Sequence, residues 1–474
     1  MKEDSIKEIA EKMKKFEEMG LDPFGKKSSI DSGGAEEKPK TILECSLSYS
    51  LSDESGQKTA GGEAKAKLDR DYFSVLPQFA DPLLFSFRDI LEITEEDYKI
   101  NLTLTSKEKL TLYNLGYHFE DFSRVFSGLR NEVLIKDMLM DEKLRKSVPE
   151  AEFLYSDENA VEKQKGKCEV RLYETALIII PEKGEITRIP YSDILEISGE
   201  DYAISLLIES RGKIIFSRIG REFDPFKKAL SDAMNELSLK IQISIKELLP
   251  QADPSILRKA GRLMREGRAA KKGEIESVSP ELWKALEKKL ETAGMKEEYE
   301  FLRSLSRQEK ICIGFKRGLL GDLTGEYIWF LIPLYSTNPK EPGNAVAMEA
   351  ASEEDSGKAT YFFRMVSRKD YRNFRNIEDL DTEADNFIKK INRCMIAINF
   401  RREPVYLAKE KLEEPQYSKY KFSIRKLPEL QFLRDFFIGR VIHTSPQQWK
   451  KDAEDLLKFN ISTENEKSKW GKGG

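Results

Sequence analysis

Histidine and cysteine, which bind metals and act in redox and nucleophilic sites, are scarce in this chain of 474 residues. The two histidines, His118 and His443, lie far apart and in no catalytic motif. Two histidines so far apart exclude a multi-histidine metal site, and a Ser-His-Asp triad could use only one of these two as its base. No CxxC pair exists, so neither a zinc knuckle nor a disulfide framework is indicated. We expect four free thiols, at Cys45, Cys168, Cys312 and Cys394.

Long apolar runs and an excess of positive charge are also missing. No uninterrupted apolar run is long enough for a membrane-spanning helix, so none is expected. The N-terminal segment lacks the hydrophobic stretch of a signal peptide, which favours a cytoplasmic protein. With 79 Lys and Arg against 83 Asp and Glu, the net charge of -4 argues against a globally basic nucleic-acid binder. No cofactor motif is recognisable, and no cofactor is expected.

The strongest positive feature of the sequence is an internal duplication. Residues 86–134 and 190–238 align without a gap at an offset of 104, and eighteen of the 49 aligned positions are identical. The sequence DILEI, for example, begins at both Asp89 and Asp193. Similarity at a fixed period indicates two copies of one structural unit. We therefore predict that residues 60–135 and 165–240 have the same fold.

Each copy shows the periodicity of strands and then that of a helix. Apolar and polar residues alternate over 100–104, which is typical of a half-buried strand. Over 119–129 the apolar residues recur at spacings of three, four and three, which is typical of a helix with one apolar face. Each copy is therefore predicted to contain several antiparallel strands closed by one helix. Phe122 and Phe226 are predicted to be buried beneath these closing helices.

Strands, an Asp-Ile-x-x-Ile step, a two-strand hairpin and Phe-x-x-Phe at the start of the last helix together resemble the pleckstrin-homology-like superfold. The resemblance covers residues 41–140 and 146–250. Phosphoinositide-binding members of that family carry a Lys/Arg cluster in the first hairpin, whereas the corresponding loop at 52–63 has almost no positive charge. The Trp that eukaryotic members usually carry in the closing helix is absent from both copies. The resemblance therefore implies the fold and not lipid binding.

The expected fold class is α+β. It comprises two tandem pleckstrin-homology-like β-barrel or sandwich domains, each closed by a C-terminal helix, then a helical connector and a C-terminal α+β domain. Four strand-like runs and a long helix in this last domain raise the hypothesis of a third, diverged copy, although no residue-level match supports it. The predicted parts are an amphipathic helix at 1–20, a flexible linker at 21–40, the duplicated domains at 41–145 and 146–250, the connector at 251–305, the C-terminal domain at 306–460 and a polar tail at 461–474.

A cluster of basic residues lies on a predicted helix in the connector. Residues 258–272 contain seven basic residues and one acid. One interpretation is an anion-binding patch for nucleic acid or an anionic lipid surface, with Arg262, Arg265 and Arg268 exposed. The other is a connecting helix whose basic face is solvated or meets acidic groups of the same chain. The candidate anion-binding residues are Arg258, Lys259, Arg262, Arg265, Arg268, Lys271 and Lys272.

A group of glycines lies near the start of the C-terminal domain. The four glycines between Gly314 and Gly325 do not match a phosphate-binding loop, which would end in Gly-Lys-Ser/Thr and begin a helix. A hairpin connection between two strands explains them better. A deep pocket lined by Asp322, Arg317 and Glu326 would instead favour an enzyme.

The repeated acids, among them Asp89 and Asp193, invite comparison with catalytic carboxylate pairs. Their duplication favours a role in the fold instead, with the Asp capping a short turn. We therefore predict a non-enzymatic scaffold or adaptor that binds other proteins through its tandem domains. Two alternatives remain: a peripheral binder of nucleic acid or anionic membrane that uses 258–272, and an enzyme of unrecognised type that uses the C-terminal domain. No catalytic or metal-binding residue is identified, and the partner and the oligomeric state stay open.

Overall fold

The computed structural model divides the chain into two compact units. Among the described residues, the first unit runs to Leu139 and adds Leu407–Lys426, and the second unit contains the rest. The amphipathic helix and linker predicted at 1–40, and the tail from 463 onwards, lie outside the described residues. The described residues are 41–139, 142–182, 186–200, 202–209, 212–316, 326–338, 341–352, 359–398 and 400–462.

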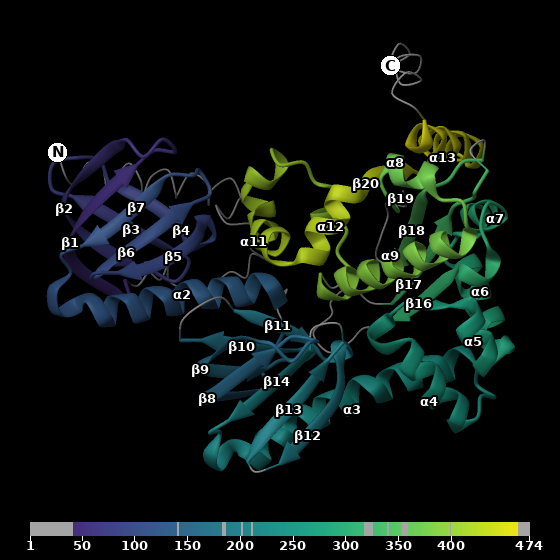
Figure 1. The fold of residues 1–474 in the computed structure, drawn as a ribbon, viewed down its shortest axis with the longest axis horizontal. Coiled ribbons are helices and arrows are strands. Elements are labelled where there is room, and N and C mark those ends of the chain that lie inside the picture. Colours follow the sequence, from purple (N-terminus) through teal and green to yellow (C-terminus); the bar gives the residue numbers. More distant parts are fainter. Residues whose placement is uncertain are drawn as a thin grey trace, which may run out of the picture. The chain divides into compact units, whose positions relative to one another are not determined.

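The first unit is built on a curled antiparallel sheet of seven strands in the order β4-β3-β2-β1-β7-β6-β5, followed by the long helix α2 (Figure 1). Alternate side chains of its strands point to a shared core, as the periodicity predicted. The elements are β1 (Leu43–Ser52), β2 (Lys58–Leu68), β3 (Tyr72–Pro77), β4 (Leu83–Ser86), the 3₁₀ turn η1 (Phe87–Asp89), β5 (Ile90–Glu96), β6 (Lys99–Leu104), β7 (Lys109–Tyr113), the 3₁₀ turn η2 (Gly116–His118) and α2 (Phe119–Leu139).

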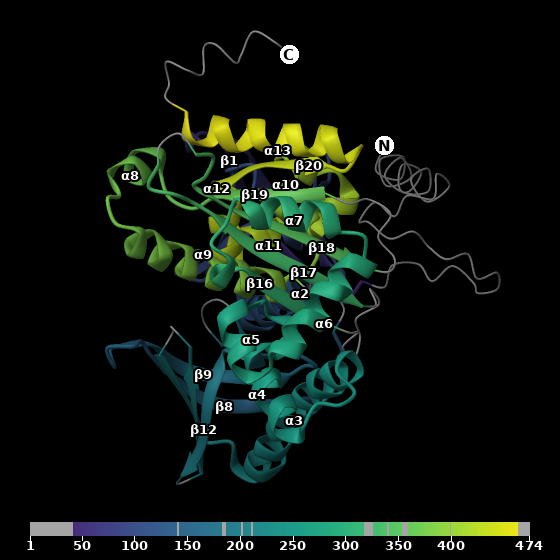
Figure 2. The same ribbon diagram turned by 90° about the vertical axis from the view of Figure 1, so that its right-hand side faces the viewer.

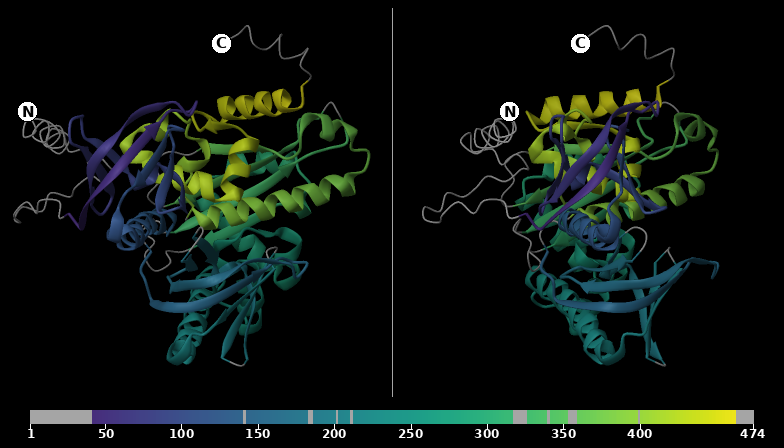
Figure 3. Two further views of the ribbon diagram at one scale, coloured as in Figure 1. Left: turned by 60° about the vertical axis from the view of Figure 1, so that its left-hand side comes forward. Right: turned by 90° about the vertical axis from the view of Figure 1, so that its left-hand side faces the viewer.

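The second unit begins with the same arrangement. Its seven strands follow the equivalent order β11-β10-β9-β8-β14-β13-β12, and the sheet curls beside its own helix α3 (Figure 3). The elements are β8 (Lys146–Ser156), β9 (Glu162–Leu172), β10 (Ala176–Pro181), β11 (Thr187–Pro190), the 3₁₀ turn η3 (Tyr191–Asp193), β12 (Ile194–Glu200), β13 (Ala203–Ile208), β14 (Gly212–Ser217), the 3₁₀ turn η4 (Gly220–Glu222) and α3 (Phe223–Leu248). We call the two arrangements the first and second modules.

The predicted equivalence of the two copies is confirmed element by element. Phe119 begins α2 and Phe223 begins α3, and the two residues are separated by the same 104 positions as the two copies. Phe122 and Phe226 both have 0% exposed surface and lie in the cores of their modules, as predicted. Gly116 is left-handed at the entry to its helix, with φ +57°, a conformation that favours glycine. The repeated apolar residues are therefore the ones that fill each core.

The second unit continues through short helices into a third, six-stranded antiparallel sheet ordered β15-β16-β17-β18-β19-β20. Its elements are α4 (Pro254–Leu263), the 3₁₀ turn η5 (Arg265–Gly267), β15 (Ala270–Lys271), α5 (Lys272–Val278), α6 (Pro280–Thr292), α7 (Lys296–Ser304), the 3₁₀ turn η6 (Gln308–Lys310), β16 (Cys312–Lys316), β17 (Tyr327–Leu334), β18 (Ala345–Ser352), β19 (Ala359–Arg364), α8 (Arg368–Asn373), α9 (Ile377–Ala397), α10 (Glu403–Tyr406), α12 (Pro428–Phe436), β20 (Phe437–Ile442) and α13 (Pro446–Ile461).

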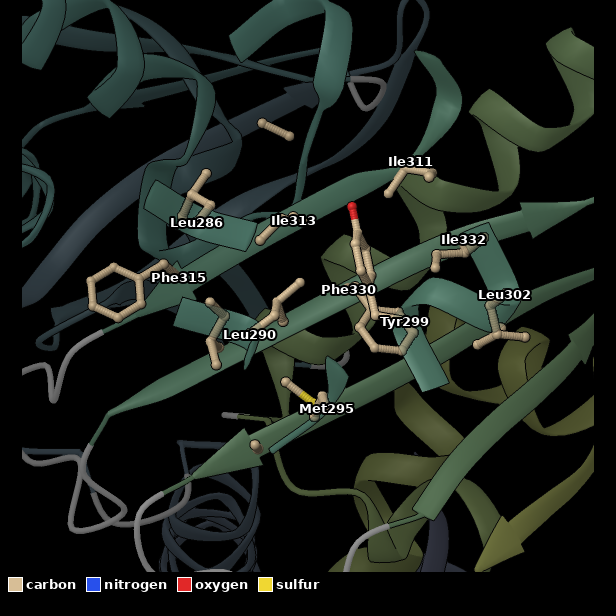
Figure 4. Packing of buried hydrophobic residues seen from close by; sticks show 14 of the residues in the cluster. Leu286, Leu290, Met295, Tyr299, Leu302, Ile311, Ile313, Phe315, Phe330 and Ile332 are labelled. Carbon is tan, nitrogen blue, oxygen red and sulfur yellow. The ribbon is translucent and has the colours of Figure 1, made fainter. Parts of the chain in front are cut away.

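The third sheet has helices on both faces. Leu290 of α6 and Tyr299 of α7 pack over Ile313 and Phe330 of the strands (Figure 4). Helix α9 covers the opposite face (Figure 2), where the ring of Phe387 lies against a phenylalanine of β19. The strands of this third sheet lie side by side in chain order, as a meander. In the two modules, by contrast, β1 lies next to β7 and β8 lies next to β14. The hypothesis that this domain is a third copy is therefore wrong.

Two segments differ from the predicted organisation. Residues 407–426 were assigned to the C-terminal domain by sequence, yet they pack in the first unit. They form the 3₁₀ turns η7 (Lys411–Glu413) and η8 (Pro415–Tyr417) and the helix α11 (Ser418–Lys426). The sequence of 428–442 predicts a helix, yet helix α12 ends at Phe436. Residues 437–442 form β20, which pairs with β19 and is rich in the aromatic and β-branched residues that favour strands.

Candidate functional site at the repeated turn and helix

The candidate site is the surface where each module's 3₁₀ turn meets its closing helix. We call the surface formed by η1 and α2 the first corner, and the surface formed by η3 and α3 the second corner. Asp89 and Asp193 end the two turns, and their backbone carbonyls accept equivalent hydrogen bonds of 2.8 Å from Thr105 and Glu209. The predicted capping role of the two acids is wrong, because Ser86 caps η1 through its side chain and η3 has no side-chain cap. The carboxylates of the two acids contact other groups.

Both acids pair with a basic residue from outside their own module. Lys421 of α11 lies 4.0 Å from Asp89, and Arg268, just after η5, lies 3.8 Å from Asp193. The two basic residues come from unrelated parts of the sequence. Each corner therefore places a basic residue of a distant segment within 4.0 Å of the same repeated carboxylate.

At the first corner, α11 packs against α2 and η1, and Figure 1 shows α11 beside α2. Arg425, one helical turn after Lys421, donates a hydrogen bond of 2.9 Å from its guanidinium to the backbone carbonyl of Arg88. Tyr420 and Ser423 are buried on the same helix. The docked helix thus adds two cations to the corner, and Tyr420 and Ser423 beside them are buried.

At the second corner, the docked segment is the turn η5 and the residue after it. The backbone N–H of Ser192 donates to the Glu266 carboxylate at 3.0 Å, and Arg265 donates to the Ile194 carbonyl at 3.5 Å. Arg268 also donates to Glu209 at 3.4 Å. Carbonyl and carboxylate oxygens of the module accept from basic side chains here, as they do at the first corner.

The two corners differ in the side chains beneath the turn. In the first module, Arg88 forms a buried bidentate ion pair with Asp137, with distances of 2.8 and 2.9 Å. The equivalent positions in the second module are Ser192 and Ile241, which cannot form such a pair. A cavity of about 50 Å³ lies there, lined by residues that include Ser192, Ile241 and Glu266. The Glu266 side chain thus enters the region that an internal ion pair occupies in the first module.

Glu266 is an unusual residue in this setting. It is buried at a left-handed backbone position with φ +52°, which a glutamate rarely adopts. One of its carboxylate oxygens and the Ser192 hydroxyl make no hydrogen bond within the described structure. Burial raises the pKa of Glu266 to about 7, and the nearby Arg188 guanidinium opposes that shift. The carboxyl group can therefore hold a proton near neutral pH.

The predicted basic helix over 258–272 is wrong as a continuous element. Helix α4 ends at Leu263, and the left-handed Glu266 turns the chain before any further helix can form. Arg258, Lys259 and Arg262 are exposed on α4, as the anion-binding interpretation requires. These three residues are the only members of the predicted set that share a solvated helix.

The other four predicted anion-binding residues meet groups of the same chain. Arg265 and Arg268, predicted to be exposed, are partly buried at the second corner. Lys271 forms an ion pair of 2.8 Å with Asp385. Lys272 lies 3.8 Å from Glu276 and above the ring of Trp283. The set therefore does not form one free basic patch.

The glycine-containing segment yields no site among the described residues. Gly314 lies in β16, where a Cβ atom would come within 2.1 Å of the Trp329 ring, so close packing of the strand requires glycine. Residues 317–325, and with them Asp322 and Arg317, lie outside the described residues. Glu326 forms an ion pair with Lys289. Within the described residues no group of His, Cys, Asp and Glu has the arrangement of a metal site.

A buried polar cluster in the C-terminal domain was not found by sequence reasoning. His443 lies between two carboxylates, 3.3 Å from Glu298 and 3.2 Å from Glu349. Thr360 donates to Glu349 at 2.5 Å and accepts from Trp449 at 3.1 Å. The members come from α7, β18, β19, the end of β20 and α13, so no sequence spacing connects them. The cluster joins the helices to the sheet, which is a role in the fold.

Comparisons with known proteins identify no family. No family model matches the chain, and no curated protein matches it. A solved structure titled as the C-terminal domain of an unknown protein from Leishmania infantum is 16% identical, with a TM-score of 0.18, over 22% of this chain and 97% of that one. The Spt16D Pob3N heterodimer is 13% identical, with a TM-score of 0.14, over 37% of this chain and 96% of that one. Within the described residues, no helix is long and apolar enough to cross a membrane.

Proposed function

We propose that the chain is a non-enzymatic scaffold or adaptor whose two modules are pleckstrin-homology-like domains that bind segments of other proteins. The domain assignment is supported by seven antiparallel strands followed by one closing helix, repeated at a constant offset. The single observation that carries the function is the repeated corner. In both copies the same Asp forms a long ion pair with a basic residue of a segment from elsewhere in the chain.

The chemistry of the corners suits peptides and not anions. Each corner presents a carboxylate and backbone carbonyl oxygens, which accept hydrogen bonds from Lys and Arg side chains. The carboxylates of Asp89 and Asp193 would repel anionic lipid headgroups and phosphates. The corners therefore favour a basic protein segment as the partner of each module.

Binding of nucleic acid or of an anionic membrane surface has weaker support. It would rest on Arg258, Lys259 and Arg262 alone, because the other four basic residues contact groups of the chain. Changing these three to Glu leaves both corners intact. The triple variant therefore separates this alternative from the scaffold, which should keep its partners.

Partner capture from the native host, followed by mass spectrometry, tests the proposal. The Asp89→Lys variant should lose proteins that the wild-type chain retains, because it replaces an acceptor with a cation at the first corner. Glu63→Lys, which makes the same charge change at an exposed site on β2, should retain them. Identical sets of captured proteins from wild type, D89K and the corresponding D193K would contradict the proposed role of the corners.

A further inference from the structure

We infer that the contact between the turn η5 and the second module depends on pH, and that the carboxyl group of Glu266 is responsible. The contact is stronger when this group carries a proton and weaker when it is ionised. No partner takes part, so this property does not depend on the proposed function. The second corner is thus a proton-sensitive joint within the chain.

The turn η5 is fixed to two parts of the second unit. On one side, the backbone N–H of Ser192 in the second module donates to the Glu266 carboxylate at 3.0 Å. On the other side, the Gly267 carbonyl accepts from the indole of Trp329 in the third sheet at 2.8 Å. The Asn392 side chain of α9 forms two hydrogen bonds, of 2.8 and 3.1 Å, with the backbone just after the turn. Glu266 therefore lies on the module side of a turn that is also bound to the third sheet.

The carboxyl group of Glu266 is buried and only half satisfied. Glu266 is 4% exposed and lines the cavity of about 50 Å³ together with Ser192 and mainly apolar residues. The Ser192 N–H binds one carboxyl oxygen, whereas the other oxygen and the Ser192 hydroxyl make no hydrogen bond within the described structure. A carboxylate in such a site lacks the donors that water would supply, which raises its free energy. The neutral acid does not carry this cost.

Charged groups of both signs lie around Glu266. They come from β11, β16, η5, η3 and the segment before β8, and they are Arg188, Lys316, Arg265, Asp193, Glu142 and the Tyr191 hydroxyl. Helices α3 and α4 add uncharged residues to the cavity, among them Ile241. Two of the cations contact other groups, since Arg188 lies 3.4 Å from Glu142 and Arg265 donates to the Ile194 carbonyl. Acids and bases thus act on Glu266 in opposite directions, and burial decides the balance.

The direction of the pH dependence follows from this burial. It raises the pKa of Glu266 to about 7, and when the corner opens and the side chain enters water, the pKa returns towards 4.5. Between these two values the closed corner therefore binds a proton more tightly than the open one. The stabilisation is fully present below pH 4.5 and is lost as the pH rises through about 7. Opening of the corner, whether local or global, should be more frequent in mildly alkaline solution.

Hydrogen exchange over residues 265–269 of the full-length chain tests this dependence, with rates expressed as protection factors to remove the intrinsic effect of pH on exchange. Protection in wild type should be at least about tenfold higher at about pH 5.5 than at about pH 8, because each unit of pKa shift is worth a factor of ten. Glu266→Gln keeps an oxygen that accepts from Ser192 and cannot ionise, so its protection should be high and similar at both pH values. Glu196→Gln, the same change at an exposed position of β12, should keep the wild-type dependence.

Glu266→Gly provides a second neutral chain if the glutamine variant does not fold, because glycine adopts the left-handed conformation without cost. Its protection should also be similar at the two pH values. Equal protection of wild type at both pH values would overturn the inference. A wild-type dependence on pH that persists in E266Q or E266G would overturn it as well, since another group would then be responsible.

Discussion

Replacing Arg88 by Ala should lower the free energy of unfolding of the first module by about 3–5 kcal/mol, the cost of leaving one member of a buried ion pair unpaired. The partner Asp137 has only 4% of its side chain exposed, so water cannot replace the guanidinium. Burial already raises the pKa of Asp137, and Arg88 opposes that shift. The loss should therefore become smaller at acidic pH, where Asp137 can take up a proton.

The double variant Arg88→Met with Asp137→Leu is the matched control. It removes both charges and keeps most of the apolar volume, so its stability should be close to that of wild type. Hydrogen exchange of α2 and β5 reports on this module separately from the rest of the chain. The ion-pair account would be contradicted by an R88A variant as stable as wild type, or by a double variant as unstable as R88A.

Truncating the first aromatic residue in the core of each closing helix should have an effect of similar size. Phe122→Ala and Phe226→Ala should each cost about 3–5 kcal/mol, from lost apolar burial and the cavity that remains. Both side chains are fully buried and occupy equivalent positions. Thermal unfolding and the exchange of each module's strands measure the two losses. A variant with an unchanged melting temperature would contradict the core role assigned to that phenylalanine.

The modules could be predicted from sequence because their determinants are local and duplicated. Alternating strand residues and the helical spacing after Phe119 are readable within one copy. The second copy repeats these patterns 104 residues later, which excludes coincidence. The duplication also singles out Asp89 and Asp193. The predicted capping of the turn by their side chains is wrong, because their backbone carbonyls instead accept from Thr105 and Glu209, which follow β6 and β13.

The partners of those acids could not be predicted, because they come from distant segments. The distance along the sequence from Asp89 to Lys421 differs from that between Asp193 and Arg268, so no common spacing predicts both contacts. The sequence of 258–272 predicts a basic helix, and a single left-handed Glu266 ends that pattern. Residues 407–426 pack away from the domain that surrounds them in sequence. Each of these features depends on tertiary contacts and not on local periodicity.

Hydrogen exchange of the α11 amides in a charge-swap series tests most directly whether the repeated Asp holds a basic segment. The series comprises Asp89→Lys, Lys421→Glu and the double variant that carries both changes. Each single change places like charges at the first corner, so exchange over Ser418–Lys426 should accelerate relative to wild type. The double variant restores an opposite-charge pair and should return protection towards the wild-type level. Protection of α11 that is the same in all four chains would contradict the role of Asp89 as a docking group.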